Sequence, residues 1–407
     1  MIGPTTTVGG LIAGGGMAYF NGFDFRQFDG HDDPSGGAIV DGSTPIPPGV
    51  RPTSARTLRR PGTNFRNGLR GNSPGDSAVL QASTRNDPRG GTNRPVAGGP
   101  AIGDPVIRLA TFNIKTFGPK KTSDPWVMNR IADIVANFDV IAIQEVRGSE
   151  GEPIRSLVDR LRSRGRHYAA VVSDPIGLGS SYTESYAVMW DRASVEMIAG
   201  TDFVVTDPME RIAREPMACS FRCRVDPAVG RRGFTFTLLN VHTSPDEVRR
   251  NIENSSMNVL DDVFVNVRRY VAASMAEDDV ILVGDLNVDA DHLGELGSMP
   301  RIKALAPVAA GDRPGAGDTR RVGGSRSETT RAAVPTNVLG TEVYDHIILD
   351  VDATTEHNGV AGVASIGSMF GLSMDDALKI SDHQPVWAEF SVYESVPSVT
   401  SRTRVLR

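Results

Sequence analysis

The strongest constraint on the fold is a series of short apolar runs that begins near residue 106. Runs of this kind, rich in β-branched side chains, are typical of buried strands. Several of them end in a polar side chain that can bind a cation or carry a proton. These runs are IRLATFN (107–113), VIAIQE (140–145), FTLLNVH (236–242) and ILVGDLN (281–287). One such ending is common, but several together predict strands whose ends converge on one polar site.

Strand-like and helix-like patterns alternate along residues 105–393. The patterns predict strands over 107–113, 140–145, 186–190, 234–242, 280–285, 343–349 and 385–390, and helices over 126–137, 154–162, 257–273 and 374–380. Asp124 followed by Pro125 is a typical helix start, and Ser373 precedes two carboxylates that a helix N-terminus favours. We therefore expect one large domain of strands and helices over 105–393, followed by a flexible tail over 394–407.

The predicted site contains carboxylates, amides and imidazoles but no thiol. Such oxygen ligands suit Mg²⁺, Mn²⁺ or Ca²⁺ rather than zinc or copper. The chain has two cysteines, Cys219 and Cys223, in a stretch that reads as extended. Residues four apart on a strand are about 13 Å apart, whereas a disulfide needs Cα atoms within about 7 Å. We expect both cysteines to be free.

Residues 1–104 differ in composition from the rest of the chain. From residue 21 they are rich in Gly, Pro, Asp and Arg, without a sustained apolar period. We expect this extension to be disordered, because it buries too little surface to offset chain entropy. The run VGGLIAGGGMAYF (8–20) has no Lys or Arg before it and is interpreted as an irregular terminus rather than a signal peptide. With no apolar run of membrane-spanning length, these features slightly favour a cytoplasmic protein over a secreted one.

Eight short motifs follow one another along residues 106–392. They are TFNIKTFG (111–118), IAIQEVR (141–147), SYTESY (181–186), REP (214–216), HTSP (242–245), GDLNVDA (284–290), YDHI (344–347) and ISDHQPV (380–386). In this order they resemble the endonuclease/exonuclease/phosphatase superfamily. TFNIKTFG, SYTESY and GLSMDDALKISDH (371–383) are more particular to its deoxyribonuclease I branch, which the chain resembles most.

The resemblance implies an α+β fold, a four-layered α/β sandwich in which helices flank two mixed β-sheets. It implies a monomeric, metal-dependent endonuclease that hydrolyses phosphodiester bonds in DNA, leaves 5′-phosphate ends and uses Mg²⁺ or Mn²⁺. The net charge of −6 argues against a basic protein that coats nucleic acid, but not against an enzyme that binds phosphate through a cation. The family's structural calcium sites lie partly in loops that differ here, notably 311–334, so Ca²⁺ is an alternative ion only.

The resemblance also implies a catalytic set of two imidazole–carboxylate pairs and an Asp–Asn pair that orients the attacking water. These residues are His242 with Glu184, His383 with Asp345, and Asp285 with Asn287. A neutral imidazole can take a proton from water, and a protonated one can give a proton to the leaving oxygen. The carboxylate behind each ring fixes its tautomer. Which histidine is the acid stays open, and in parts of the superfamily the aspartate activates the water instead.

Metal and substrate contacts follow from the same resemblance. Glu145 is the implied principal metal ligand, with Asn113 beside it and Asp382 across the cleft. Residues at positions that contact DNA are Tyr182, Arg147 and Arg214. Taken singly, each has a simpler explanation: a turn residue, a surface aromatic or a member of a structural ion pair.

Two other classes of function remain open. The first is a superfamily phosphoesterase that acts on sphingomyelin, an inositol phosphate or abasic DNA. SYTESY, which matches the groove-contacting loop of the deoxyribonuclease branch, argues against it. The second is an inactive scaffold that uses the fold only for binding. Retention of both His–carboxylate pairs and of the metal ligands argues against that alternative.

Overall fold

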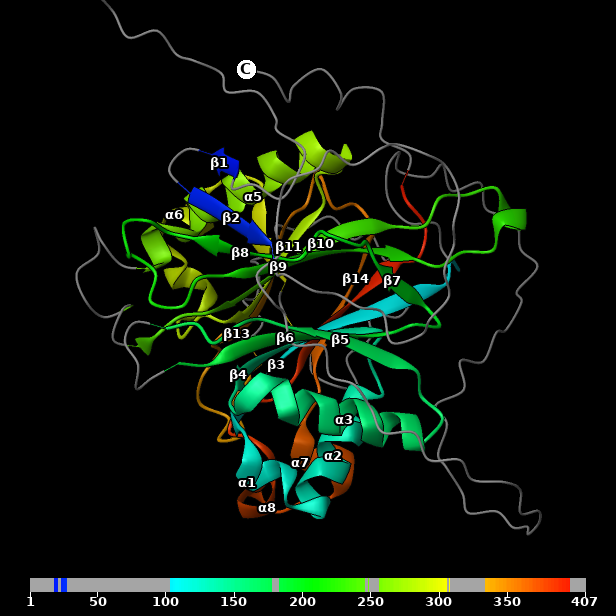
Figure 1. Ribbon diagram of the computed structural model, residues 1–407, viewed down its shortest axis with the longest axis vertical. Coiled ribbons are helices and arrows are strands. Elements are labelled where there is room, and N and C mark those ends of the chain that lie inside the picture. The colour runs from blue at the N-terminus through cyan, green and yellow to red at the C-terminus, as the bar shows by residue number, and fades with distance from the viewer. Residues whose placement is uncertain are drawn as a thin grey trace, which may run out of the picture. The chain divides into compact units, whose positions relative to one another are not determined.

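The computed structural model describes residues 18–20, 23–27, 103–177, 183–245, 248, 256–305, 307 and 334–395. Over these residues two β-sheets pack face to face, and helices cover both outer faces (Figure 1). One sheet is covered by α5 (Leu260–Met275) and α6 (Gly294–Ser298). The other is covered by α1 (Pro119–Thr122), α2 (Pro125–Val135), α3 (Glu152–Ser163), α7 (Ile366–Phe370) and α8 (Met374–Ile380). The predicted four-layered sandwich is confirmed.

The first sheet contains nine strands in the described part of the chain. Their order is β1 (Ala18–Phe20), β2 (Phe23–Gln27), β8 (Phe203–Thr206), β9 (Met217–Cys223), β10 (Thr235–His242), β11 (Val280–Asp285), β13 (Asp345–Asp350) and β12 (Ile302–Ala304), and β7 (Val195–Met197) pairs with β9. β10 and β11 are parallel, with His242 beside Asp285. β13 is antiparallel to β11, with Asp345 beside Asp285. This register places three predicted site residues side by side, at the same end of three neighbouring strands.

The second sheet contains six strands. Their order is β14 (His357–Val363), β15 (Val386–Ser391), β3 (Val106–Phe117), β4 (Val140–Val146), β6 (Ser185–Asp191) and β5 (Tyr168–Val172). β3 and β4 are parallel, and their register shifts after Asn113. The ladder between β4 and β6 shifts between Ile143 and Val146. Such irregularities re-aim side chains, and here they occur where the strands deliver Asn113 and Glu145.

Three apolar cores hold the layers together. The core between the sheets contains a row of aromatic rings, in which Phe234 stacks on Phe236 and Phe390 with centroid distances of 5.0 and 5.9 Å. A second core lies between the first sheet and α5, and a third between the second sheet and the helices α2, α3 and α8. Burying one large apolar side chain contributes about 1.5–3 kcal/mol. Packing of these apolar faces, which the sequence pattern predicted, therefore holds the strands and their ends in place.

A buried pair of amides joins the two sheets beneath the strand ends. The amide nitrogen of Gln144 donates to Asn240 Oδ1 at 2.6 Å and to Thr111 Oγ1 at 3.0 Å. Asn240 donates in turn to the backbone oxygens of Ile143 and Ala187, both at 3.3 Å. Since Gln144 and Asn240 are fully buried, these bonds fix the two sheets relative to each other in a way that apolar packing alone does not.

The predicted strands and helices are all present, with ends that shift by a few residues. Both predicted helix caps are confirmed: Asp124 accepts from Trp126 N at 2.9 Å, and Ser373 Oγ accepts from Asp376 N at 3.2 Å. α1, α6, α7, β5, β7, β8, β12 and β14 lie outside the predicted set, because they are short or, as in β14 (HNGVAGV), lack an apolar pattern. Cys219 and Cys223 are buried in β9 as free thiols, as expected.

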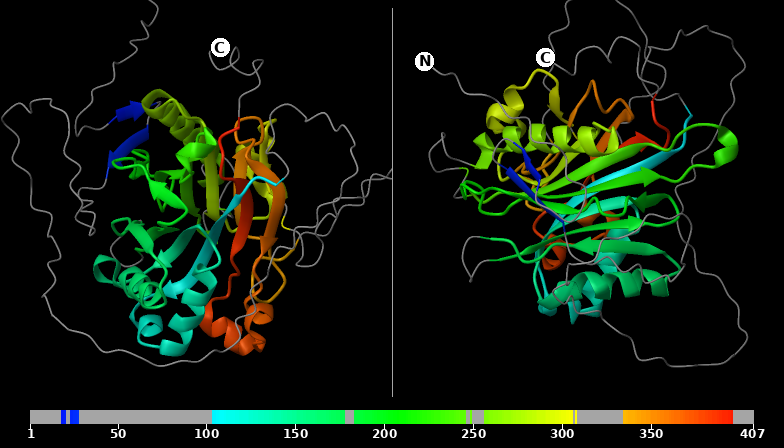
Figure 2. Two further views of the ribbon diagram at one scale, coloured as in Figure 1. Left: turned by 90° about the vertical axis from the view of Figure 1, so that its right-hand side faces the viewer. Right: turned by 45° about the horizontal axis from the view of Figure 1, so that its top comes forward.

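Part of the N-terminal extension belongs to the fold. β1 and β2 form a hairpin, and β2 pairs antiparallel with the edge of β8, with Asp24 beside Thr206 and Gln27 beside Phe203 (Figure 2). These two strands lie outside the predicted set, because strands of three and five residues are too short to show a readable period. Residues 1–17, 28–102 and 396–407 lie outside the described residues.

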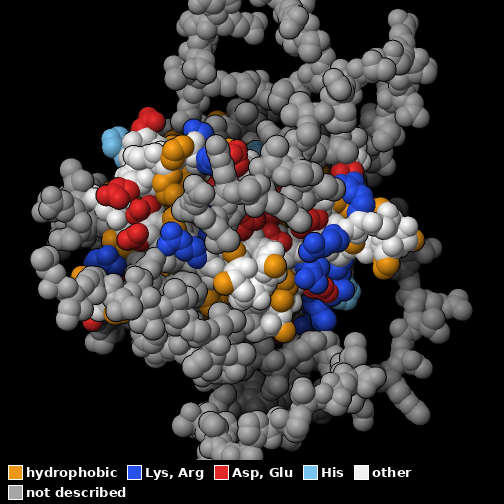
Figure 3. All heavy atoms as spheres, turned by 90° about the horizontal axis from the view of Figure 1, so that it is seen from above, with side chains coloured by type: hydrophobic (Ala, Val, Ile, Leu, Met, Phe, Trp, Pro, Cys, Tyr) orange, Lys and Arg blue, Asp and Glu red, His pale blue; other side chains and the backbone are white. Residues whose placement is uncertain are grey.

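The described surface carries charges of both signs. On the face seen in Figure 3, acidic and basic side chains both occur, in keeping with the small net charge of −6. None of the described helices is long and apolar enough to cross a membrane.

Candidate active site

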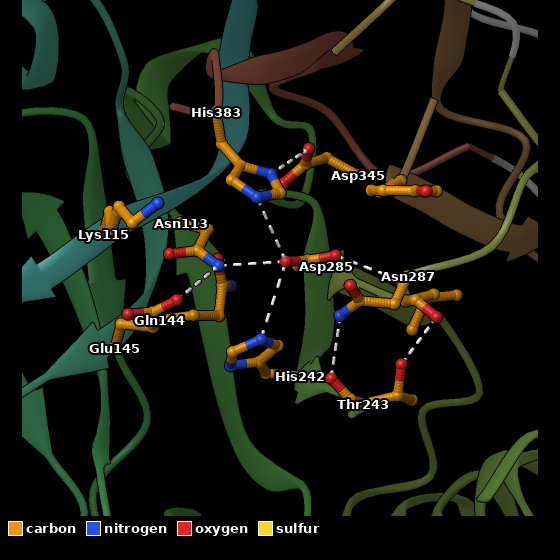
Figure 4. Close-up of polar contacts among 12 residues, drawn as sticks. Asn113, Lys115, Gln144, Glu145, His242, Thr243, Asp285, Asn287, Asp345 and His383 are labelled. Atoms are coloured by element: carbon orange, nitrogen blue, oxygen red, sulfur yellow. Dashed lines mark hydrogen bonds and ion pairs between the residues drawn. The ribbon is translucent and has the colours of Figure 1, made fainter. Parts of the chain in front are cut away.

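The converging strand ends form one polar site around Asp285 (Figure 4). Asp285 ends β11 of the first sheet, and Asn113 lies in β3 of the second. The Asn113 amide donates to Asp285 Oδ2 at 2.9 Å and to Glu145 Oε1 at 3.2 Å. The site therefore spans both sheets, as the polar endings of the apolar runs predicted.

Two imidazole–carboxylate pairs flank Asp285. His242 Nδ1 lies 2.5 Å from Glu184 Oε1, and His383 Nδ1 lies 2.8 Å from Asp345 Oδ2. The Nε2 atoms of both rings lie 3.5 Å from Asp285 Oδ2. Each ring thus has a carboxylate behind it, which fixes its tautomer, and turns its other nitrogen toward the same oxygen of Asp285.

The environment sets the charge of these groups. Burial alone would lower the pKa of His383, but the charge and hydrogen bond of Asp345, with Asp285 and Asp382, outweigh it and raise that pKa to about 10. Burial would raise the pKa of Glu184, but the bond to His242 and the charge of Arg214 outweigh it and lower that pKa. Glu184 is therefore a carboxylate at neutral pH, as a group that holds an imidazole in place must be.

Asp285 itself is almost fully buried at the centre of the site. Burial raises its pKa, partly opposed by the nearby His383 and His242 rings and by the Asn113 hydrogen bond. Its second oxygen accepts from Asn287 N at 3.0 Å, and the Asn287 side chain donates to Thr243 O at 2.8 Å. Asp285 and Asn287 are therefore fixed as one unit.

Backbone conformations that are unfavourable for most residues occur at this site. Glu145 has φ 59° and Asn287 has φ 53°, a region that costs non-glycine residues about 1–3 kcal/mol. Gly284 is required next to Asp285, because a Cβ there would lie 1.7 Å from Val241 O on the parallel strand β10. Strain of this kind persists only where the surrounding structure holds it, and it clusters at functional sites.

The predicted metal ligands lie beside the histidine pairs. Glu145 Oε2 accepts from Thr116 N at 2.7 Å, and Oδ1 of Asn113, buried in the site, has no hydrogen-bond partner. Buried polar atoms normally have one. The Glu145 carboxylate and this free amide oxygen fit a hard divalent cation, whereas Asp382 Oδ2 is paired with Lys115. Asp285, Asp345 and His383 also offer ligand atoms within 4.8 Å of one another, and His383 Nδ1 in this group is already engaged by Asp345.

Two lysines to which the sequence assigned no role approach the metal ligands, Lys115 within the TFNIKTFG motif and Lys121 in α1. Lys115 Nζ lies 2.5 Å from Asp382 Oδ2, and Lys121 Nζ donates to Ile380 O at 2.7 Å. Burial lowers the pKa of Lys121 to about 8, although the charges of Glu145 and Asp382 oppose the shift. Lysine near a strand end is so common that sequence alone gave no signal for these two residues.

The predicted DNA contacts have different positions. Arg147 is partly exposed beside the site, with Nη2 4.0 Å from Glu145 Oε2. Arg214 is buried, and its Nη1 donates to the backbone oxygens of His242 and Thr243 at 3.0 and 3.1 Å. Arg214 is therefore better placed to hold the backbone at the end of β10 than to make the expected direct contact with DNA. Tyr182 lies outside the described residues.

One further residue of the SYTESY motif supports the site. Tyr186 is fully buried, and its hydroxyl accepts from His242 N at 2.9 Å. The same motif supplies Glu184, two residues earlier and just before β6, so Glu184 holds the ring of His242 and Tyr186 holds its backbone. The spacing of Glu184 and Tyr186 on one face of a strand was the available signal.

Fold and site together define a phosphoesterase of the Endonuclease/Exonuclease/phosphatase family. The sequence profile of that family matches residues 110–383, more than half of the chain, and the chain belongs to it. Within the family it is deoxyribonuclease I-like. It is 26% identical over 311 residues to human (Homo sapiens) deoxyribonuclease-1-like 2, covering 70% of this chain and 92% of that protein.

Other known proteins are similar over the same region. Pig (Sus scrofa) deoxyribonuclease-1 is 28% identical over 293 residues, covering 69% of this chain and 90% of its own length. Among solved structures, the human Nocturnin catalytic domain with a bound sulfate anion matches with a TM-score of 0.44 at 13% identity, covering 72% of this chain and 96% of that one.

Proposed function

We propose that the protein is a metal-dependent endonuclease that hydrolyses phosphodiester bonds in DNA and leaves 5′-phosphate ends. The observation that carries the proposal is the geometry of His242 and His383. Both rings are backed by a carboxylate, and both Nε2 atoms face the same oxygen of Asp285 at 3.5 Å. The similarity to deoxyribonucleases over most of their length supports DNA as the substrate.

The reaction needs one proton taken and one proton given. The oxygen of water forms a bond to phosphorus while the bond from phosphorus to the 3′ oxygen breaks. A neutral imidazole accepts the proton of the water, and an imidazolium on the other side donates a proton to the leaving 3′ oxygen. Glu184 and Asp345 stabilise the charged form of their rings, and the Asp285–Asn287 unit orients the water between them.

The cation would be held by Glu145 and Asp382 with the Asn113 amide oxygen. Mg²⁺ or Mn²⁺ bound there supplies positive charge that offsets the negative charge on the phosphate oxygens. Arg147 lies beside Glu145 and can contact the DNA backbone. We also propose that Tyr182 contacts DNA, and that Arg214 acts by positioning the backbone at His242 and Thr243.

A digest of supercoiled plasmid with Mg²⁺, Mn²⁺, Ca²⁺ or EDTA tests the proposal. We expect nicked circles with 5′-phosphate ends in Mg²⁺ or Mn²⁺ and none in EDTA. His383→Ala, purified in the same way, excludes a contaminating nuclease. If the plasmid stays intact while phosphocholine is released from sphingomyelin, or phosphate from an inositol phosphate, the substrate is another phosphoester and not DNA. No hydrolysis of any of these would indicate a binding scaffold.

A further inference from the structure

The loop that follows β11, residues 285–288, carries two of the proposed catalytic groups. Asp285 ends the strand, and Asn287 lies two residues later with φ 53°. In this left-handed conformation Asn287 N donates to Asp285 Oδ1 at 3.0 Å, and the Asn287 side chain donates to Thr243 O at 2.8 Å (Figure 4). A backbone conformation of this kind persists only where neighbouring groups hold it. The residues that hold the 285–288 loop therefore decide where Asp285 and Asn287 point.

Leu286, the residue before Asn287, is held by both neighbouring strands. From the end of β10, Thr243 Oγ1 donates to Leu286 O at 2.5 Å. On the side of β13, Leu286 N donates to Tyr344 O at 2.8 Å. These two bonds fix the loop on the N-terminal side of Asn287, so a second attachment is needed on its other side.

Val288, the residue after Asn287, is held by the ring of His346. His346 Nε2 lies 2.7 Å from Val288 O. Both residues are buried, with exposed fractions of 4% for His346 and 8% for Val288, so the bond is shielded from water. Because a carbonyl oxygen only accepts, the Nε2 atom must carry the proton. Asn287 is thus fastened on both sides, by a backbone pair before it and by an imidazole after it.

The position of His346 in β13 explains why it reaches the loop and not the catalytic centre. Successive side chains of a strand point to opposite faces. Asp345 bonds to His383, so His346, the next residue, lies on the other face of the sheet. Its partner on β11 is Gly284, which has no side chain to compete for the space beside the ring. The imidazole therefore acts on the backbone of the loop.

We propose that His346 is a positioning residue for the reaction: by holding the Val288 carbonyl, its Nε2–H group fixes the conformation of Asn287 and the orientation of Asp285. The inference rests on the endonuclease function proposed above. Loss of the donor lets Asn287 leave the left-handed conformation, and the bonds from Asn287 to Asp285 and Thr243 are then lost together. His346 bonds to a carbonyl oxygen, whereas the rings of His242 and His383 bond to carboxylates, so its role is not proton transfer.

The experiment compares two replacements of His346 in the full chain by single-turnover plasmid nicking in Mg²⁺. His346→Leu removes the donor, and His346→Gln keeps an N–H group close to the position of Nε2. We expect His346→Leu to lower kcat by about 10-fold with KM for the plasmid changed less than about twofold, because a misplaced catalytic group slows the reaction step itself. His346→Gln should restore most of kcat. Rates are divided by the folded fraction from thermal unfolding, so that a loss of stability alone does not count.

A double variant tests whether His346 acts through Asn287. Adding His346→Leu to Asn287→Ala should lower kcat little further, because the group that His346 positions is already absent. His357→Leu is the matched control, since it makes the same change to a ring that packs against Phe390 at the start of β14. This variant should keep the kcat of the folded wild-type protein.

Wild-type kcat in His346→Leu would overturn the proposal. Equal losses in His346→Leu and His346→Gln, or full additivity with Asn287→Ala, would overturn it as well. If His346→Leu does not fold, nitrogen-15 NMR of the histidine rings in the wild-type protein tests the bond directly. A proton on Nε2 of His346 supports the proposal, and a ring protonated only on Nδ1 contradicts it. Failure of the wild-type protein to nick plasmid would instead contradict the proposed function, and the variants are then compared on the phosphoester that it does hydrolyse.

Discussion

His242 and His383 approach one carboxylate oxygen from opposite sides, each with Nε2 at 3.5 Å from Asp285 Oδ2. They come from different sheets: His242 ends β10, and His383 lies just before β15. The distance between the two rings is therefore set by the packing of the whole sandwich. A phosphate group placed between them would meet a proton acceptor and a proton donor at once.

The first prediction concerns these two rings. His242→Ala and His383→Ala should each lower the rate of single-turnover plasmid nicking by at least about 10²-fold, the usual loss for a general acid or base. The double variant should lose less than the product of the single losses, because both rings act in one transition state. His292→Ala is the control, since its ring is exposed and bonds only to Asp289 among the described residues. Near wild-type rates in both single variants would show that the proposed chemistry is wrong.

The second prediction concerns the cation. Cleavage should stop in EDTA and return with Mg²⁺ or Mn²⁺, and Glu145→Gln should lower kcat by about 10²-fold or more and raise the metal concentration needed for half-maximal rate. Asp289→Asn, which changes an exposed carboxylate of the GDLNVDA segment, should leave both quantities unchanged. Undiminished cleavage by protein stripped of metal would contradict the prediction.

The third prediction separates the two arginines. Arg147→Ala should weaken DNA binding and reduce its salt dependence, while most of kcat is retained, because a phosphate contact releases counterions. Arg214→Ala should instead lower kcat and Tm together, because it leaves two backbone oxygens without their donor and removes the cation 3.6 Å from Glu184 Oε2. Binding measured in Ca²⁺ over a series of salt concentrations, beside single-turnover rates, distinguishes the two. An unchanged salt slope in Arg147→Ala would remove Arg147 from the DNA interface.

The fourth prediction concerns the amide pair that joins the sheets. Asn240→Leu should lower the free energy of unfolding by about 1–3 kcal/mol, because the buried Gln144 amide loses one of its two acceptors. Gln144→Leu should do the same, and the double variant should lose less than the sum. Denaturant unfolding curves give all four values, with Thr237→Val, at another buried polar position, for comparison. Additive losses would mean that the two amides do not act as a pair.

The fifth prediction concerns the N-terminal extension. A variant that lacks residues 1–104 should still cleave DNA, because the first strand of the site, β3, begins at Val106. Its Tm should fall, because removal of β2 leaves the edge of β8 without the strand that pairs with it. A matched variant that lacks only residues 28–102 keeps β1 and β2. If the shorter chain is insoluble or inactive beside active full-length protein, the extension is part of the catalytic fold.

Local patterns predicted much of the fold and the centre of the site. Apolar runs that end in Asn113, Glu145, His242 and Asp285 mark strands, and strand ends meet at a sheet edge. The rest depends on contacts between distant segments. Nothing near Arg214 in sequence shows that its side chain is buried. Nor does the sequence show that the carboxylates of Glu277 and Glu394, which adjoin strands of different sheets, lie close together. Short strands such as β2 give too few residues for a period to be read.

The backbone of Glu145 has a practical consequence for anyone who engineers this enzyme. At φ 59°, glycine or asparagine is better tolerated than glutamate, so Glu145→Gly or Glu145→Asn relieves strain while it removes the proposed metal ligand. A library selected for yield or heat resistance alone will accumulate inactive molecules at this position. Screens for more stable variants must therefore measure DNA cleavage in every round.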